Sequence, residues 1–153
     1  MPKTKVVLDT NVLISGILFG GNPRQILELV IQGRINAYIS PAILTEFREV
    51  LIRPKFGLTH KECFSIAKEI EDIFCFVFPQ ITVDLIKDDP DDNIILECAL
   101  AADVKYIITG DPHLLNLEWF EKIKIISPAT FVTEFQASGS KNGRIRLAIS
   151  DSD

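Results

Sequence analysis

Positive charge, long apolar runs and cysteines are all scarce in this sequence, and each scarcity excludes a class of protein. The 153 residues carry 16 lysines and arginines against 21 acids, a formal net charge of -5. That balance argues against a protein that binds nucleic acid through a generally basic surface, but not against an enzyme whose metal ions neutralise phosphates. No apolar run has the length of a transmembrane helix, and the charged N-terminus lacks the apolar stretch of a signal peptide, so no membrane contact is expected.

Cysteine usage indicates the compartment. The three cysteines, Cys63, Cys75 and Cys98, are odd in number, have no CxxC spacing and lie in apolar stretches. This pattern is typical of buried, reduced thiols. A cytoplasmic protein is therefore expected, and neither a disulfide nor a zinc site is predicted.

What the sequence does contain is an alternation of predicted strands and helices. With 47% hydrophobic residues, the chain is long enough to form one domain with a full core. The predicted strands are 6–8, 37–40, 105–109 and 122–126, with further extended segments at 76–78 and 81–83. The predicted helices begin at Asn22, Pro41, Thr59 and Asp92, and two more cover 112–117 and 129–135. This order predicts an α/β fold with a central, mainly parallel sheet covered on both faces.

The chain is expected to divide into one domain at 1–136 and a C-terminal tail at 137–153. The tail begins Ser/Gly-rich and ends in an acidic tip after a short stretch of alternating basic and apolar residues. We interpret it as a linker with a docking strand, or as a frayed end.

Four acids occupy comparable positions in this scheme. Asp9 and Asp111 each end a strand, whereas Glu46 and Asp92 lie near the starts of two helices. Strand ends and helix starts at one edge of a parallel sheet converge in space, at the edge where open α/β sheets bind ligands. Carboxylates gathered there repel one another unless cations lie between them, and hard cations such as Mg²⁺ prefer oxygen ligands. Such ions can activate a water and stabilise the leaving oxygen of a phosphodiester.

Each acid also has an ordinary structural explanation. Asp9 suits a turn, Glu46 suits the start of a helix, and Asp111 before Pro112 suits an N-cap. Asp92 competes with three neighbouring aspartates of the loop 87–92 as a helix cap in a solvated acidic segment.

Two further polar residues near these acids are not predicted to be ligands. His113 is more typical of a surface histidine, because no second histidine lies near it in the sequence. Glu97 lies five residues after Asp92. On a helix this spacing turns its side chain about 140° away from that of Asp92.

Four stretches that carry these acids resemble, in this order, the PIN-domain ribonucleases, in the branch of toxins from bacterial and archaeal toxin–antitoxin systems related to VapC-type toxins. The stretches are 7–15 with Asp9-Thr10-Asn11, 40–47 with Glu46, 89–99 with Asp92, and 108–115 with Gly110-Asp111. A single Asp-Thr-Asn is a weak signal, but four stretches in order, within about Lys5 to Phe135, are a strong one.

The resemblance implies a three-layer α/β/α sandwich and an endoribonuclease that uses one or two Mg²⁺ or Mn²⁺ ions. By position it assigns an acidic tetrad, Asp9, Glu46, Asp92 and Asp111. Asp9, Asp92 and Asp111 would be metal ligands, and Glu46 would close the cluster or act through a water. Three polar residues would orient the ligands or the scissile phosphate: Asn11, Ser15 and Thr109. The implied partners are an RNA substrate, a cognate antitoxin and a second copy of the chain in a homodimer.

Two departures from the family pattern bear on the site. His113 stands where this branch often has another acid, so it either alters the affinity for metal or lies outside the site. Asp91 is a one-residue alternative to Asp92, but the helical phase favours Asp92, because Ile95 and Ala99 then bury its side of the helix.

Two other enzymatic or signalling functions fit the sequence less well than a ribonuclease. A phosphatase with an aspartate nucleophile usually has a second aspartate where this chain has Asn11, and a receiver domain needs a late lysine that 106–111 does not supply. The alternative that stays open is a non-catalytic PIN fold that binds RNA or a partner. Substrate contacts are unassigned, since four basic residues suit phosphate contacts and ordinary surface charge alike: Arg48, Arg53, Lys55 and Lys87.

Overall fold

A six-stranded sheet forms the centre of the part of the chain that the structure describes, residues 2–87 and 90–138 of a computed structural model. Its strands are β1 (Thr4–Leu8), β2 (Ile35–Ile39), β3 (Cys75–Phe76), β4 (Tyr106–Ile108), β5 (Trp119–Phe120) and β6 (Ile123–Ile126). They lie in the order β3-β2-β1-β4-β6-β5, and neighbours are parallel except β5 and β6. The predicted α/β fold with a mainly parallel sheet is confirmed.

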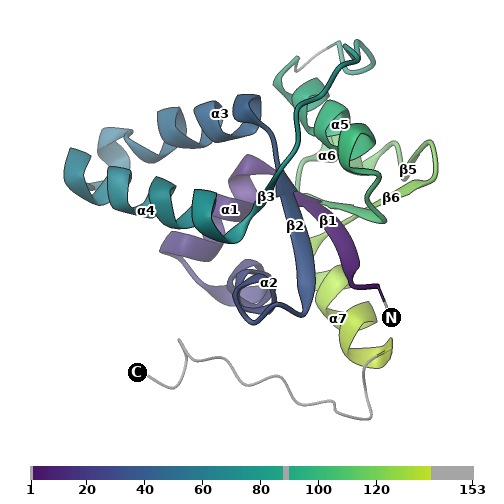
Figure 1. Cartoon of the computed structure of the whole chain (residues 1–153), viewed down its shortest axis with the longest axis horizontal. Coiled ribbons are helices and arrows are strands. Elements are labelled where there is room, and N and C mark those ends of the chain that lie inside the picture. The colour runs from purple at the N-terminus through teal and green to yellow at the C-terminus, as the bar shows by residue number, and fades with distance from the viewer. Residues whose placement is uncertain (1, 88–89, 139–153) are drawn as a thin grey trace.

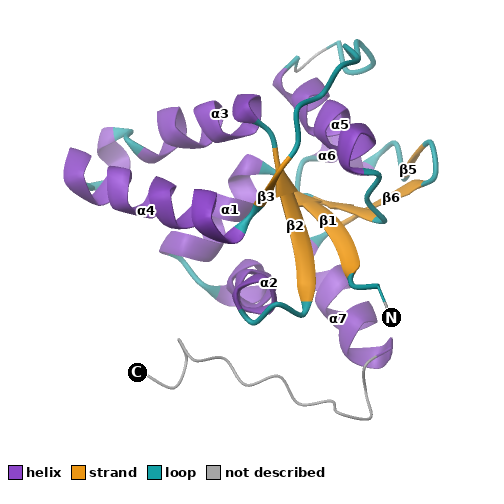
Figure 2. Cartoon of the chain, viewed as in Figure 1, coloured by secondary structure: helices purple, strands orange, loops and turns teal. Residues whose placement is uncertain are grey.

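Helices lie on both sides of this sheet (Figures 1 and 2). They are α1 (Thr10–Leu18), α2 (Gly21–Ile31), α3 (Pro41–Leu51), α4 (His60–Ile73), α5 (Asp91–Ala102), α6 (Pro112–Leu115) and α7 (Pro128–Ser138), with a 3-10 turn at Pro54–Phe56. The connections from β1 through β3 step in one direction along the sheet, and the return to β4 steps in the other. Because such crossovers are right-handed, α1 to α4 lie on one side and α5 packs on β1, β2 and β4 from the other. None of the helices in the described ranges is long and apolar enough to cross a membrane.

The central strand β1 explains why the sheet holds together. Val6, Val7 and Leu8 are fully buried, as an apolar run covered on both faces requires. β1 pairs with β2 on one side and β4 on the other, and Leu8 is in register with Ile108. The last residues of β1 and β4 therefore lie side by side, and the polar residues that follow each strand emerge at the same edge.

Local signals set two of the helices that surround this edge. Ser40 caps α3 by accepting the N–H of Ile43 at 3.3 Å, and Pro41 occupies the first helical position. Thr59 and Glu62 form a capping box at the start of α4. The apolar residues of α3 are buried against the rest of the core: Ile43, Leu44, Phe47, Val50 and Leu51.

The predicted start of α2 was wrong. α2 begins at Gly21 rather than with Asn22 as its cap, because Gly20 and Gly21 adopt positive φ angles of 90° and 70° that turn the chain directly out of α1. Residues 81–83, expected to be extended, belong to none of the six strands, and the N–H of Val83 donates to the Glu97 carboxylate at 2.9 Å. The short antiparallel strand β5 was not predicted, since two residues carry no periodicity.

The cysteine prediction holds at two of three positions. Cys63 and Cys98 are buried, and burial raises the pKa of the Cys98 thiol to about 12, so it stays protonated. Cys75 is exposed, because it lies on β3, the edge strand of the sheet. The proposed boundary between domain and tail stays a prediction; α7 ends at Ser138, and the rest of the tail lies outside the described residues.

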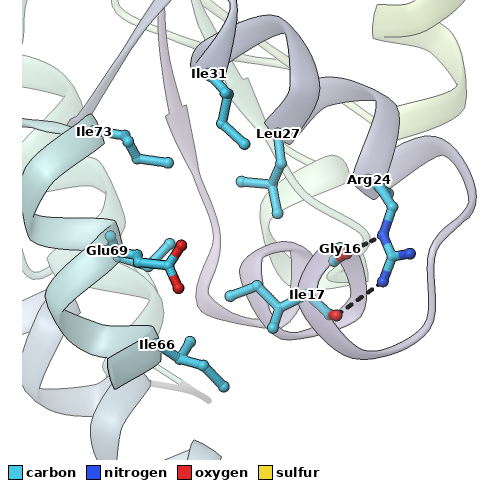
Figure 3. Close-up of a pocket in the computed structure, with 9 residues that line it drawn as sticks. Gly16, Ile17, Arg24, Leu27, Ile31, Ile66, Glu69 and Ile73 are labelled. Atoms are coloured by element: carbon cyan, nitrogen blue, oxygen red, sulfur yellow. Dashed lines mark hydrogen bonds between the residues drawn. The ribbon is translucent and has the colours of Figure 1, made fainter. Parts of the chain in front are cut away.

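An apolar groove of about 180 Å³ lies between α4 and the pair α1–α2 (Figure 3). Its lining comes from these three helices: Gly16, Ile17, Arg24, Leu27, Ile31, Ile66, Glu69, Ile70 and Ile73. Arg24 is held at one end, where its guanidinium donates to the carbonyls of Gly16 and Ile17, both at 2.9 Å. A Cβ on Gly16 would lie 2.6 Å from Leu27 Cδ1 and 3.0 Å from the Pro23 carbonyl, so α1 and α2 need glycine here to approach.

Candidate metal centre

Asp9 lies at the carboxyl end of β1 and is only 6% exposed. Its N–H donates to the Ile108 carbonyl at 3.0 Å, which ties the ends of β1 and β4 together beside the carboxylate. Its carbonyl accepts the N–H groups of Val12 and Leu13 at the start of α1. The backbone N–H groups of Thr10 and Asn11 at the start of this helix also favour the ionised Asp9 carboxylate, although none of them makes a capping hydrogen bond of normal geometry.

Thr109, fully buried after β4, connects two of the acids. Its hydroxyl donates to Asp9 Oδ2 at 2.6 Å and accepts the N–H of Asp111 at 3.0 Å. A serine or threonine hydroxyl can donate once and accept at its lone pairs, so one side chain fixes both aspartates. Thr109 thus sets the spacing between Asp9 and Asp111.

Asp92, Asp111 and His113 form a compact group of potential metal ligands. One ligand atom from each lies within 4.8 Å of the other two. Asp92, in the first turn of α5, is buried, whereas Asp111 is half-buried and His113 is exposed. Asp111 also has the structural role expected of it, because its Oδ1 accepts the N–H of His113 at 2.8 Å and caps α6. It shares Thr109 with Asp9, so it links this group to the end of β1.

Glu46 approaches the same edge from α3. Its Oε1 accepts a 2.6 Å hydrogen bond from the Thr10 hydroxyl, in the residue that follows Asp9. The negative charges of Asp9 and Asp91 both act on the Glu46 carboxyl group. The four acids of the predicted tetrad therefore gather at one edge of the sheet, and Asp91 adds a further carboxylate.

Burial and mutual repulsion make Asp9 and Glu46 hard to ionise in the absence of a cation. The pKa of Asp9 is raised above its ordinary value, first by desolvation and also by the charge of Asp111, against the opposing hydrogen bond from Thr109. The pKa of Glu46 is raised for the same reason, with Asp91 and Asp9 as the repelling charges and Thr10 as the opposing donor. Both shifts are expected where carboxylates converge in a partly dry site.

The donor set fits a divalent cation. Oxygen atoms of several carboxylates are the ligands that Mg²⁺ and Mn²⁺ prefer, and a cation between them removes the repulsion that raises these pKa values. The half-buried Asp111 and the exposed Asp91 leave part of the edge open to water and substrate. The ligand atoms of Asp92 and Asp111 lie close enough together to share one ion, and Asp9 and Glu46 lie beside them.

The three predicted orienting residues lie in different environments. Thr109 contacts Asp9 and Asp111 directly. Asn11 and Ser15 share a face of α1, four residues apart, where Asn11 is exposed and Ser15 is half-buried. Thr10 was not predicted, although it lies between Asp9 and Asn11. Its bond to Glu46 depends on how α1 packs against α3, which no local pattern encodes.

Two residues of α5 hold the preceding loop. The Asn93 side chain accepts the N–H groups of Leu85 and Ile86 at 3.0 and 2.8 Å and donates to the Ile86 carbonyl at 2.9 Å. Glu97 contacts Val83, so it points away from Asp92 as expected. Asp92 is buried and Asp91 is exposed, in agreement with the helical phase that favours Asp92. This role of Asn93 was not predicted from the sequence, because an asparagine in the first turn of a helix is typical of an ordinary helix cap.

Two of the four basic residues considered for phosphate contacts have acidic partners. Arg48 pairs with Glu71 at 2.6 Å, and Lys87 pairs with Asp84 at 2.8 Å. Arg53 and Lys55 are exposed. Ordinary surface charge therefore accounts for Arg48 and Lys87.

Comparison with known proteins agrees with this architecture. The PIN domain family matches residues 5–113, a range that includes all four acids. An uncharacterised protein of Methanocaldococcus jannaschii, MJ1680, is 30% identical over 146 residues, 88% of this chain and 93% of that protein. The solved structure of VapBC2 from Rickettsia felis, bound to a DNA fragment from their promoter, matches 81% of this chain and 98% of that chain, with a TM-score of 0.59 at 12% identity. The last likeness is one of fold. The chain belongs to the PIN domain family.

Proposed function

We propose that this protein is a metal-dependent endoribonuclease that hydrolyses RNA phosphodiester bonds in the cytoplasm, as the toxin of a type II toxin–antitoxin system. The observation that carries the proposal is the gathering of Asp9, Glu46, Asp92 and Asp111 at one sheet edge at a cost in repulsion. A fold without use for a cation gains nothing from such a cluster. The family supports the reaction class, and the likeness to VapC-type toxins supports the biological role.

In this mechanism the protein's residues hold the metal ions and orient the substrate, and they form no covalent bond with it. Asp9, Asp92 and Asp111 would hold one or two Mg²⁺ or Mn²⁺ ions, and the ions would supply the activation of a water and the stabilisation of the leaving oxygen of the phosphodiester. Thr109 fixes the separation of Asp9 and Asp111 through its two hydrogen bonds. Thr10 holds Glu46 at the rim, from where its carboxylate can accept a proton from water. Asn11 and Ser15 offer polar groups to the scissile phosphate from α1.

The test is cleavage of a mixed RNA pool by purified protein with Mn²⁺, with Mg²⁺ and with EDTA, beside Asp9→Asn. We expect cleavage with either metal, none with EDTA, and a loss on the order of 10³-fold in Asp9→Asn. Asp84→Asn is the matched control, because Asp84 is an exposed aspartate paired with Lys87 away from the cluster. No cleavage by folded protein shown to be free of a bound partner would instead favour the non-catalytic RNA- or partner-binding module.

The proposed protein partners are a cognate antitoxin and a second copy of the chain. The resemblance to VapC-type toxins and the fold shared with the solved VapBC2 assembly support this proposal. If it holds, expression of the chain alone slows bacterial growth, the Asp9→Asn variant does not, and co-expression of the antitoxin restores growth. Light scattering of the purified chain tests the homodimer.

A further inference from the structure

His113 lies on the solvent side of the carboxylate group and carries the one nitrogen ligand in it. Its Nδ1 is 3.5 Å from Asp111 Oδ1 and 3.9 Å from Asp92 Oδ2. The side chains are progressively more exposed from Asp92 at 7%, through Asp111 at 17%, to His113 at 47%. The imidazole therefore caps the open end of a site whose carboxylates lie deeper.

The two distances are too long for hydrogen bonds and suit a shared ion. A charged N–H···O⁻ bond spans about 2.7–2.9 Å, shorter than either separation. Two donors that each bind one divalent ion at about 2.1 Å lie roughly 3 to 4 Å apart. Asp111 Oδ1 also already accepts the backbone N–H of His113 at 2.8 Å, so the ring is not needed to satisfy that oxygen.

We propose that His113 Nδ1 is a ligand of the metal ion held by Asp92 and Asp111, and that it makes this site select a first-row transition ion, such as Mn²⁺ or Co²⁺, over Mg²⁺. The inference deepens the proposed function, since it concerns the same site, but it is a statement about metal binding and not about cleavage. It assigns to His113 a role that its exposed position alone does not suggest.

The selectivity follows from the donor types. Mg²⁺ is a hard cation that prefers oxygen and keeps its waters, so an imidazole adds little to its binding. Transition ions bind imidazole well, and their affinity for a nitrogen-containing site rises from Mn²⁺ through Co²⁺ to Ni²⁺. The required tautomer has its proton on Nε2 and the lone pair of Nδ1 directed at the carboxylates.

Spectroscopy of bound Mn²⁺ tests the ligand directly. The chain has two histidines, His60 and His113, so a ¹⁴N coupling of imidazole type in the pulsed EPR of the Mn²⁺-loaded protein can be assigned by two variants. We expect the coupling in the wild type and in His60→Ala, and its loss in His113→Asp, which retains Mn²⁺ through oxygen. Absence of the coupling in Mn²⁺-loaded wild type overturns the proposal.

Affinities measured by calorimetry test the selectivity. We expect His113→Ala to weaken Co²⁺ binding by about tenfold or more and Mg²⁺ binding by less than about threefold. His113→Asp should narrow the preference for Co²⁺ over Mg²⁺, and His60→Ala should leave it unchanged. Equal weakening for both metals would indicate a role in folding or packing and contradicts the proposal.

These readouts separate the two proposals. A ¹⁴N coupling without any RNA cleavage would support the assignment of His113 as a ligand and contradict the ribonuclease proposal. Metal-dependent cleavage with no ¹⁴N coupling, and with unchanged metal selectivity in His113→Asp, would support the ribonuclease proposal and contradict the ligand assignment.

Discussion

The acidic edge of the sheet, formed by Asp9, Glu46, Asp92 and Asp111, and the apolar groove between α4 and the α1–α2 pair are built from opposite chemistry. At the acidic edge, hydrogen bonds from Thr10 and Thr109 hold carboxylates that repel one another. In the groove, aliphatic side chains pack between helices, and Arg24 is satisfied by backbone carbonyls at one end. Without metal, the acidic edge destabilises the fold, whereas the groove stabilises it.

Function and stability are therefore located in different parts of the domain. Apolar side chains removed from water stabilise the fold, each by a few kcal/mol at most. Carboxylates brought together without a cation do the reverse, so their placement is explained by what they bind. Substitutions in the two regions should therefore separate metal binding from stability.

The largest effect on stability is expected from Leu27→Ala in the groove. Leu27 is 6% exposed and lies over Gly16, where α1 approaches α2. Truncation should lower the free energy of unfolding by about 3 kcal/mol, because it removes buried methyl groups and leaves a cavity. Urea denaturation measures the loss, and the affinity for Mn²⁺ should not change.

Ile31→Ala is the matched control for this prediction. Ile31 lines the same groove on the same helix but is 54% exposed. Its truncation should cost less than about 1 kcal/mol. A loss of Mn²⁺ affinity in Leu27→Ala would contradict the separation of the two regions.

Asn93→Ala should affect both properties. It leaves the Leu85 and Ile86 N–H groups and the Ile86 carbonyl without their partner, which should cost about 2 kcal/mol. Because Asn93 follows Asp92 in the first turn of α5, release of the loop should also weaken Mn²⁺ binding. Urea denaturation and calorimetry measure the two losses.

Asn93→Asp separates the contributions of that side chain. An aspartate still accepts the two N–H groups, but only its protonated form can donate to the Ile86 carbonyl, and its ionised form places a buried charge beside Asp92. Its cost should therefore be smaller than that of alanine only at acidic pH, where the carboxyl group is protonated. If alanine and aspartate destabilise equally at acidic pH, then hydrogen bonding by the side chain does not hold the loop.

The contrast between the two regions also explains what the sequence could reveal. Asp9 and Asp111 were predictable because the first directly follows a short apolar strand and the second comes three residues after another, and the parallel order of such strands brings their ends to one edge. The strands at the centre were predictable for the same reason, since burial on both faces leaves an unbroken apolar run such as Val6-Val7-Leu8.

Features that depend on packing between elements could not be predicted. The bond from Thr10 to Glu46 joins residues 36 positions apart and exists only because α1 packs against α3. The groove depends on the distance between α4 and α2, and the amphipathic pattern of neither helix predicts that distance. His113 illustrates the same point, because only the fold brings its ring beside Asp92.

The smallest expected effect concerns pH in the metal-free protein. Folding raises the pKa of Asp9 above the ordinary value of 3.8, so the ionised carboxyl group disfavours the folded state. Below pH 3.8 the group is protonated whether the chain is folded or not, and Asp9→Asn should then be about as stable as the wild type. As the pH rises through the raised pKa, the wild type must ionise a buried acid and loses stability relative to the variant. Urea denaturation in EDTA at several pH values measures this difference.

Added metal should reverse the order of the two proteins. With Mn²⁺ at 100 times its dissociation constant, the wild type should gain about 2.7 kcal/mol, while a variant that binds Mn²⁺ poorly gains little. Asp84→Asn controls for the loss of one carboxylate from the surface, since Asp84 pairs with Lys87 outside the cluster. If the wild type is the more stable protein in EDTA at pH 7, then Asp9 is held by its hydrogen bond to Thr109 more strongly than it is repelled. In that case its burial is structural, and the contrast between the acidic edge and the groove fails at its central residue.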